Sequence, residues 1–197
     1  MRYQADRKEK TRERVLQAAA KAIRAEGPHQ MAVATVMAKA GLTVGGFYAH
    51  FESKDDLVAA AIDQMFAEGR RRREESDRSS AETLAVDIDA YLSAAHRDSR
   101  EIGCPLSFLA ADMPRQSERA RERFAAGAAA VRGRIARKLA AMGVDDPDAA
   151  ASSLLSELVG ALSLARAEPD PAASNAILER SKTALKRRFG VESRSAT

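Results

Sequence analysis

The stretch from Ala34 to Lys54, ATVMAKAGLTVGGFYAHFESK, constrains the fold more than any other part of the chain. Two short segments with helical spacing flank Gly41-Leu42-Thr43, and a glycine just past a helix end supplies the left-handed backbone that a tight turn needs. We therefore predict one helix from about Val33 to Ala40 and another after Thr43 as N-cap. The apolar residues expected to pack them together are Val33, Val36, Leu42, Phe47 and Phe51. This pattern is typical of a helix-turn-helix, whose second helix enters the major groove of DNA.

Composition favours helix along the rest of the chain. Alanine and leucine dominate, tryptophan is absent and runs of β-branched residues are missing, so the propensities predict helix nearly throughout. Glycine and proline divide these helices at Gly27-Pro28, Gly41, Gly103-Cys104-Pro105, Pro114, Gly143, Asp146-Pro147, Glu168-Pro169-Asp170-Pro171 and Gly190. The sequence thus predicts an all-α fold of about nine helices and no sheet.

Capping residues and apolar stripes add detail to this prediction. Asp6 with Glu9 predicts a capping box at the start of the first helix, and Ser53 predicts the N-cap of a later one. Ser79 and Glu82 are expected to open a helix with the apolar stripe Leu84, Ile88, Tyr91, Leu92 and Ala95. A long helix is predicted with the stripe Phe124, Ala128, Val131, Ile135, Leu139 and Met142.

Charge is unevenly distributed, although the net charge is only +4. Residues 1–54 hold ten lysines and arginines against five acidic residues, whereas the remainder holds 22 against 23. The excess of positive charge in residues 1–54 indicates that this region binds a polyanion, although solvated helix faces are often basic too. We interpret the basic runs at 70–73 and 186–188 as such solvated helix ends, because cations there favour the helix dipole.

Several functional classes are disfavoured. No unbroken apolar run approaches the roughly 18 residues of a membrane span, and the charged N-terminus lacks the apolar segment of a secretion signal. Cys104 is the single cysteine, which excludes an internal disulfide and a thiolate zinc cluster. His29, His50 and His96 lie far apart in sequence and form no HExxH pair, and no Walker-type phosphate loop is present. We expect a cytoplasmic protein without catalytic activity, cofactor or metal.

The helix-turn-helix stretch resembles the tetracycline-repressor (TetR) family of bacterial regulators. The resemblance rests on Ala40-Gly41, Leu42-Thr43, Gly45, Phe47-Tyr48, His50-Phe51, Ser53-Lys54 and Leu57, at the family's spacing. It covers the first third of the chain residue by residue, and the rest matches only in helix count and length. It implies a DNA-binding domain at 1–54 and a ligand-binding and dimerisation domain at 55–190, with a disordered tail at 191–197.

The resemblance also implies which residues meet DNA. Thr43 at an N-cap offers its hydroxyl and backbone N–H groups to a phosphate, Tyr48 presents its phenol, and His50 reaches a phosphate. The predicted DNA contacts are Thr35, Lys39, Thr43, Val44, Gly45, Gly46, Tyr48, His50 and Lys54. For Tyr48 and His50, core packing with satisfied polar tips is the alternative.

The recognition helix is poor in hydrogen-bonding side chains. Val44, Gly45, Gly46 and Ala49 cannot make the bidentate contacts that discriminate guanine or adenine. We therefore predict specificity through thymine-methyl contact by Val44, close backbone approach at the glycines, and DNA shape. Further contacts are predicted from Thr35 and Lys39 and, in a minor groove, from Arg2 and Arg7.

Three residues depart from the family pattern. Met31 and Ala32 stand where many members have a threonine or serine, which removes one phosphate contact. Met37 stands where a small alanine is usual, so we expect the two short helices to pack slightly further apart. Neither departure abolishes the fold.

The resemblance assigns the C-terminal helices to a ligand cavity and to a homodimer interface through the last two helices. Between 152 and 165, leucines alternate with small residues, which lets helices approach closely, although an ordinary core helix has the same pattern. The pocket candidates, each individually more often plain core, are Phe66, Tyr91, His96, Cys104, Phe108, Leu109, Met113, Phe124 and Leu158. Their apolar character indicates a small hydrophobic or aromatic effector.

Cys104 carries a second hypothesis. It precedes Pro105 at a predicted helix start, where the dipole favours a thiolate, and some family members sense electrophiles or oxidants through a cysteine in a comparable region. A buried, unreactive thiol that fills space is the more frequent role.

Together these features predict a homodimeric transcriptional regulator, and we expect a repressor rather than an activator. Its palindromic operator is released when an effector moves the helix that begins near Ser53. The alternatives are a helical adaptor that has lost DNA binding and a regulator that senses through Cys104.

Overall fold

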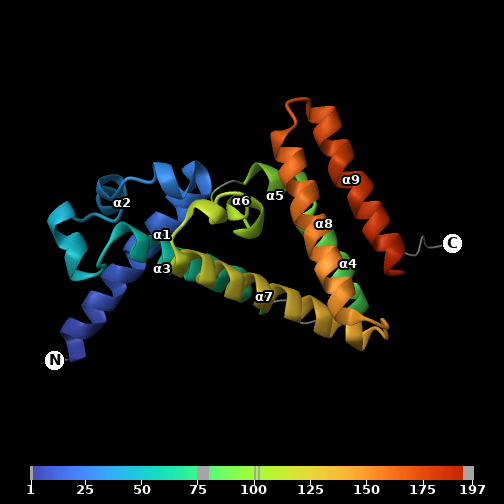
Figure 1. The fold of residues 1–197 in the computed structure, drawn as a ribbon, viewed down its shortest axis with the longest axis horizontal. Helices are drawn as coiled ribbons and strands as arrows, with labels where there is room; N and C mark the ends of the chain where they lie inside the picture. Colours follow the sequence, from blue (N-terminus) through green and yellow to red (C-terminus); the bar gives the residue numbers. More distant parts are fainter. Residues whose placement is uncertain (1, 75–79, 100, 102, 193–197) are drawn as a thin grey trace. The chain divides into compact units, whose positions relative to one another are not determined.

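The computed structural model describes residues 2–74, 80–99, 101 and 103–192, and in these ranges it contains helices and no strand (Figure 1). The nine α-helices are α1 (Arg2–Gln30), α2 (Val33–Lys39), α3 (Lys54–Glu74), α4 (Ser80–Tyr91), α5 (Ala94–Asp98), α6 (Leu106–Leu109), α7 (Glu118–Ala141), α8 (Pro147–Ala167) and α9 (Pro171–Arg188). Two short 3-10 helices are η1 (Val44–Ala49) and η2 (Met113–Arg115). The predicted all-α fold is confirmed.

The chain forms two compact units, whose boundaries fall inside α3 and α7. The first unit comprises Met1–Arg70 and Glu101–Gly127, and the second comprises Arg71–Arg100 and Ala128–Thr197. The first unit therefore holds the predicted helix-turn-helix, and the second holds the helices expected to dimerise.

The first helix of the chain begins earlier than predicted. α1 starts at Arg2, so Asp6 and Glu9 lie inside the helix rather than at its cap, and Asp6 pairs with Lys10 at 3.1 Å. A charged i, i+4 pair supports an exposed helix without a cap, which the capping-box interpretation overlooked. The predicted break at Gly27-Pro28 is present, because Gly27 has φ 81° and ψ 161° inside the helical run.

The core of the first unit joins α1, α2 and α3. Of the residues predicted to pack the two short helices, Val36, Phe47 and Phe51 are buried, whereas Val33 and Leu42 are half-buried. Apolar residues of the two longer helices complete this core: Val15, Ala22 and Ile23 on α1, and Leu57, Ala61 and Met65 on α3. Ser53 caps α3 as predicted, since its hydroxyl accepts the Asp56 N–H at 3.1 Å. These contacts attach the two short helices to the longer ones that carry them.

The turn between α2 and η1 depends on Gly41 and on an arginine that the sequence analysis did not single out. Gly41 has φ 70°, which a glycine adopts without strain. The guanidinium of Arg14 donates to the carbonyl of Ala40 at the end of α2. A cation there satisfies a terminal carbonyl and complements the helix dipole, so α1 also fixes the turn.

In the second unit α4 ends sooner than the sequence predicts. The predicted opening at Ser79 lies outside the described residues, and the stripe is buried from Leu84 to Leu92. Ala95 is exposed, because the hydroxyl of Ser93 accepts the N–H of His96 and starts the separate helix α5. An N-cap that competes with helix continuation is the physical reason for the difference.

Two proline positions also differ slightly from the prediction. Pro105 occupies the N-cap of the short helix α6 rather than its first helical position. Pro114 lies inside the 3-10 helix η2 instead of ending a helix, which a proline near a helix start permits.

α8 and α9 lie side by side as an antiparallel pair in the second unit (Figure 1). Asp146 and Asp170 cap them, accepting backbone N–H groups of Ala149 at 3.1 Å and Ala172 at 3.1 Å. These caps agree with the breaks predicted before Pro147 and Pro171.

Length and hydropathy alone make α8 a candidate membrane span, the one such helix in the ranges the structure describes. The sequence analysis found no unbroken apolar run there and missed this. A single helix of this kind is weak evidence for a membrane protein, because the core helix of a soluble protein has the same length and hydropathy. Packing against α9 accounts for its apolar residues, which include buried Leu158 and Leu162.

The basic end of α9 is paired rather than simply solvated, contrary to the prediction. Lys186 pairs with Asp89 of α4, and Arg188 lies 2.8 Å from Glu157 of α8. The sequence alone cannot reveal these partners because they lie on other helices.

Candidate nucleic-acid interface

The second helix of the helix-turn-helix is a single short 3-10 helix, η1. Thr43 precedes it in extended conformation, with φ −84° and ψ 154°, and makes no side-chain capping bond. Thr43 is exposed, so both its hydroxyl and the backbone N–H groups at the start of η1 lie at the surface.

One face of η1 is apolar, exposed and almost free of side chains that obstruct it. Val44 is 50% exposed and Tyr48 is 76% exposed, which is unusual for large apolar residues. A Cβ added at Gly45 would meet no heavy atom within 4 Å. We call Val44, Gly45 and Tyr48 the reading face.

The opposite face of η1 fixes it to the unit. Phe47 is buried, and its ring meets Tyr48 edge-on at 5.2 Å and stacks on Phe51 at 5.7 Å. An edge-to-face aromatic contact is worth about 0.5–1.5 kcal/mol beyond the area that it buries. Tyr48 is therefore held outward by its neighbour, and the core-packing alternative does not describe it.

The departure at Met37 is accommodated by a glycine. Met37 is fully buried, and its Cε would lie 3.8 Å from a Cβ added at Gly46. The missing side chain at Gly46 leaves the methionine space where α2 crosses η1. The contact also explains why Gly46 is less exposed than Gly45.

His50 follows η1 with its ring half-buried. Its Nδ1 is enclosed and has no hydrogen-bond partner. Burial lowers the pKa of His50, and the nearby cations Lys8 and Arg12 lower it further. The adjacent Phe51 is buried, and the guanidinium of Arg12 lies 5.0 Å from its ring centre. Lys8 and Arg12 were not among the predicted DNA contacts.

The other predicted contacts come from α1, α2 and the start of α3. Thr35 and Lys39 of α2 are exposed. Lys54, at the start of α3, donates to the carbonyl of His29 at 3.0 Å, so it also closes the turn between α1 and α2. An ammonium has three N–H donors, and this bond uses one of them. The side chain of Arg2 lies outside the described residues, and Arg7 is exposed.

The predicted pocket residues fall into two groups. In the first unit Phe66 and Phe124 meet edge-on at 6.1 Å, Leu109 and Met113 are buried, and Phe108 is half-buried. In the second unit the rings of Tyr91 and His96 meet at 4.8 Å, and Leu158 is buried. Cys104, in the first unit, is half-buried in the segment before α6.

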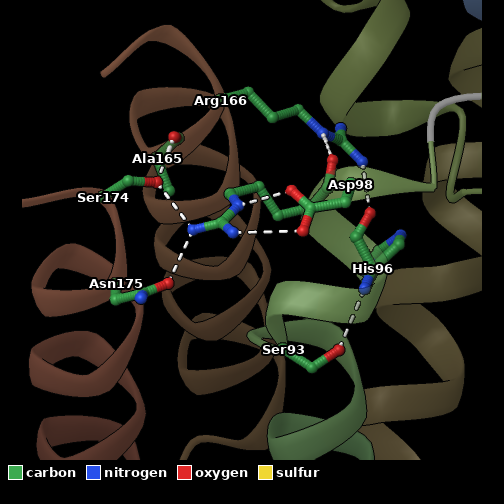
Figure 2. Close-up of polar contacts among 8 residues, drawn as sticks. Ser93, His96, Asp98, Ala165, Arg166, Ser174 and Asn175 are labelled. Atoms are coloured by element: carbon green, nitrogen blue, oxygen red, sulfur yellow. Dashed lines mark hydrogen bonds and ion pairs between the residues drawn. The ribbon is translucent and has the colours of Figure 1, made fainter. Parts of the chain in front are cut away.

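The sequence analysis missed an arginine cluster that fastens α5 to α8 and α9 (Figure 2). Arg166 donates to the carbonyls of His96 at 2.9 Å and Arg97 at 3.2 Å. Arg97 in turn donates to Ser174 at 2.9 Å and Asn175 at 2.7 Å. The sequence gives no signal for this cluster, because Arg166 of α8 binds carbonyls of α5 and Arg97 of α5 binds side chains of α9.

A hollow of about 270 Å³ lies beside this cluster, and none of the predicted pocket residues lines it. Its lining residues are Arg97, Asp98, Ala165, Arg166, Glu168, Pro169, Pro171 and Ser174. Asp98 accepts from Arg97 at 2.7 Å, so the guanidinium is already paired with a carboxylate. The cluster is explained as an anchor of α5.

A helix-turn-helix with an outward reading face, carried by a helical unit and joined to a second helical unit, defines a DNA-binding regulator. Residues 15–61 match the family model "Bacterial regulatory proteins, tetR family". Residues 80–180 match the model "Transcriptional regulator LmrA/YxaF-like, C-terminal domain". The chain belongs to the TetR family of transcriptional regulators.

Several solved structures have the same fold as this chain. A TetR transcriptional regulator from Chloroflexus aurantiacus is 27% identical, with a TM-score of 0.77 and coverage of 94% of this chain and 96% of that one. The reduced form of Escherichia coli NemR is 20% identical, with a TM-score of 0.78 and coverage of 90% and 96%. A TetR-family regulator from Agrobacterium tumefaciens is 22% identical, with a TM-score of 0.74 and coverage of 90% and 98%. No curated protein matches the chain.

Family membership carries general properties. TetR-family proteins are transcription factors that bind operator DNA and small-molecule effectors, and they are typically dimers. The chain has the helix-turn-helix DNA-binding domain and the ligand-binding C-terminal domain of this family.

Proposed function

We propose that the protein is a cytoplasmic, non-enzymatic repressor that binds a palindromic operator as a homodimer. The observation that carries this proposal is the reading face, on which Tyr48 is 76% and Val44 50% exposed around an unobstructed Gly45. A structural role would bury these apolar side chains. Two such faces related by a two-fold axis would meet successive major grooves about 34 Å apart.

The reading face supports readout by contact and shape rather than by hydrogen bonds. Val44 offers methyl groups to a thymine methyl, and Gly45 lets the backbone come close to the groove. Thr35 and Lys39 lie exposed on α2, where they can add contacts at its edge. An operator selection that returned strong guanine preferences at the centres of the half-sites would contradict this mode of readout.

The proposal is tested by fluorescence anisotropy with the protein's own upstream intergenic DNA. We expect sequence-selective binding that weakens steeply with salt, and about tenfold weaker binding for Tyr48→Ala, the loss of one good base contact. Equal and weak binding of both proteins to any duplex would contradict the proposal. An adaptor that has lost DNA binding would then be the better description.

Adding one methyl group at Gly45 should separate DNA binding from folding. Gly45→Ala should leave the free energy of unfolding unchanged or raise it, because the new Cβ meets no atom within 4 Å and alanine favours a helix more than glycine does. It should lower operator affinity about tenfold, comparable to one mismatched base pair, because the backbone can no longer approach the groove. Gly69→Ala is the matched control, since its site is equally open and lies on α3. Equal operator affinity of the two variants would exclude close approach at Gly45.

We propose that the dimer forms through α8 and α9. Leu164 on α8 is 64% exposed, which leaves a large apolar side chain uncovered in the single chain. Burial in a two-fold interface would remove it from water. Leu164→Arg should therefore yield a monomer by analytical ultracentrifugation and weaken operator binding. Val86→Arg, at the exposed apolar residue on α4, is the control and should remain dimeric. A dimeric Leu164→Arg protein would refute this interface.

For the effector we propose a small hydrophobic or aromatic compound. Two ring pairs among the predicted residues are candidate linings, Phe66–Phe124 in the first unit and, separately, Tyr91–His96 in the second. Effector binding would move α3, which begins beside Ser53, and so change the spacing of the two reading faces. Release of operator DNA in a ligand screen tests this step.

Sensing through Cys104 is the second candidate. Its half-buried position gives a reagent partial access, and the E. coli relative NemR is described in a reduced form. Labelling with an alkylating reagent at neutral pH decides the question. An unreactive Cys104 in the folded protein would end this candidate.

A further inference from the structure

The hollow beside the arginine cluster is formed within the second unit, by α5 and the turn between α8 and α9. A fixed polar side chain is part of its lining (Figure 2). Ser174 is 3% exposed, and its hydroxyl donates to the carbonyl of Ala165 at 2.6 Å and accepts from Arg97 at 2.9 Å. Ala165, Pro169 and Pro171 add apolar surface. Concave sites that hold small molecules combine apolar walls with a few placed polar groups in this way.

Arg97, which also lines the hollow, has an N–H group that the protein does not use. A guanidinium carries five N–H donors. Nε and Nη2 donate to the carboxylate of Asp98 at 2.7 and 3.1 Å, and Nη1 donates to Ser174 at 2.9 Å and Asn175 at 2.7 Å. These four bonds leave one N–H of Nη2 without a partner among the residues that the structure describes. The side chain of Arg97 is only 15% exposed, so an acceptor from outside the chain would reach this donor through the hollow.

The carboxylate of Asp98 occupies the place where a bound anion would lie. It meets Arg97 in the two-pronged geometry that arginine uses for carboxylate ligands. The side chain of Asp98 is 66% exposed, and an ion pair with so exposed a partner contributes little to stability. A carboxylate from solution can therefore replace Asp98 while the bonds from Nη1 to Ser174 and Asn175 stay in place.

The charges of the remaining lining limit the charge of the ligand. Arg166 adds a second guanidinium, which is held by the carbonyls of His96 and Arg97. Glu168 adds a carboxylate, which accepts the backbone N–H of Asp170 at 2.9 Å and so stays at the hollow. Once Asp98 is displaced, two positive charges face one negative charge, which suits a monoanion better than a dianion.

The size of the hollow limits the body of the ligand. Its volume is about 270 Å³, and a cavity of about 150 Å³ can hold a benzene ring. The apolar surface of Ala165, Pro169 and Pro171 would cover such a ring. The ligand class that fits both charge and size is a monocarboxylic acid with a body of about one ring.

We propose that this hollow binds a small monocarboxylic acid, whose carboxylate replaces that of Asp98 on Arg97 and whose apolar body lies against Pro169 and Pro171. None of the predicted effector-pocket residues lines it, so the site is separate from that pocket. The proposal concerns the second unit alone and does not depend on operator binding.

Isothermal titration calorimetry with benzoate and benzamide tests the charge of the ligand. Benzoate should bind saturably at one site per chain. Benzamide has the same ring but no negative charge, so it should bind about tenfold more weakly, the loss of a charge-assisted pair. Equal affinity for the two compounds would overturn the site, and so would a chain that binds neither.

The competition with Asp98 predicts a gain of affinity, which a purely structural ion pair does not. Asp98→Asn keeps the size of the side chain but removes its charge, so it should bind benzoate about fivefold more tightly. Arg97→Gln should bind it at least about tenfold more weakly. Arg180→Gln is the control and should bind like the unchanged protein, because Arg180 is an exposed arginine of α9 outside the lining.

Two results would contradict the exchange of carboxylates on Arg97. One is an Asp98→Asn protein that binds benzoate no more tightly than the unchanged protein. The other is an equal loss of affinity in Arg97→Gln and Arg180→Gln, which would place benzoate elsewhere. Circular dichroism melting shows whether Arg97→Gln is folded at the assay temperature, and if it is not, the Asp98→Asn result decides alone.

Discussion

Arg24→Met should lower the free energy of unfolding by about 3 kcal/mol, at the lower end of the cost of breaking a buried ion pair. Arg24 is 4% exposed and belongs to the first unit. Its guanidinium meets Glu68 of α3 at 2.8 Å and the carbonyl of Glu101 at 3.2 Å. Methionine fills much of the same volume, so the loss reports the polar contacts rather than a cavity. Urea denaturation followed by circular dichroism, at one protomer concentration, measures the effect.

The partner of Arg24 allows a sharper test. Glu68 also accepts from Gln64 at 3.2 Å, and its side chain is 25% exposed, so water partly relieves it when the arginine is gone. The double variant Arg24→Met with Glu68→Leu should be more stable than the sum of the single changes predicts. Asp6→Ala, in the exposed pair with Lys10, is the control and should cost less than about 0.5 kcal/mol. Strict additivity in the double variant would show that the pair is not coupled.

The helix-turn-helix could be predicted from sequence because its determinants are local. Gly41 provides the turn, Ser53 caps the next helix, and Phe47 and Phe51 lie four residues apart. Each acts within a few residues of its position, so the pattern contains the information. The end of α4 was predicted wrongly because two local signals compete there. The apolar stripe continues to Ala95, but the cap at Ser93 starts a separate helix.

Long-range partners could not be predicted. In the sequence Arg24 cannot be distinguished from the other polar residues of α1. Its partner Glu68 is 44 positions further along the chain, and only the fold brings the two together. Lys186 reads as a solvated helix end, yet its partner Asp89 lies on α4. Val44, Gly45 and Tyr48 can be named from the sequence because they follow the turn directly, whereas the cations near His50 and Phe51 come from α1, far earlier in the chain.

At Gly127 the sequence and the structure predict opposite effects of an alanine substitution on the free energy of unfolding. A glycine inside a helix is normally improved by alanine, by up to about 1 kcal/mol. In the structure a Cβ at Gly127 would lie 2.2 Å from two carbons of the Phe66 ring, Cδ2 and Cε2. The ring is rigid and Phe66 is buried, so the ring must leave its place or α3 and α7 must separate. We expect Gly127→Ala to lower the free energy of unfolding by about 2 kcal/mol, since overpacking costs typically 1–3 kcal/mol.

Gly133 on the same helix is the matched control for this substitution. A Cβ there would meet only the flexible end of Arg137, at 3.7 Å, so Gly133→Ala should be neutral or stabilising. Replacing Phe66 by the smaller leucine in the Gly127→Ala background should recover part of the lost stability, because leucine lacks the clashing Cε2 and its branched end is not part of a rigid ring. If Gly127→Ala is as stable as the unchanged protein, the close approach of α3 and α7 at this residue is wrong. If leucine at Phe66 restores nothing, the cost arises from the backbone at Gly127 rather than from the ring.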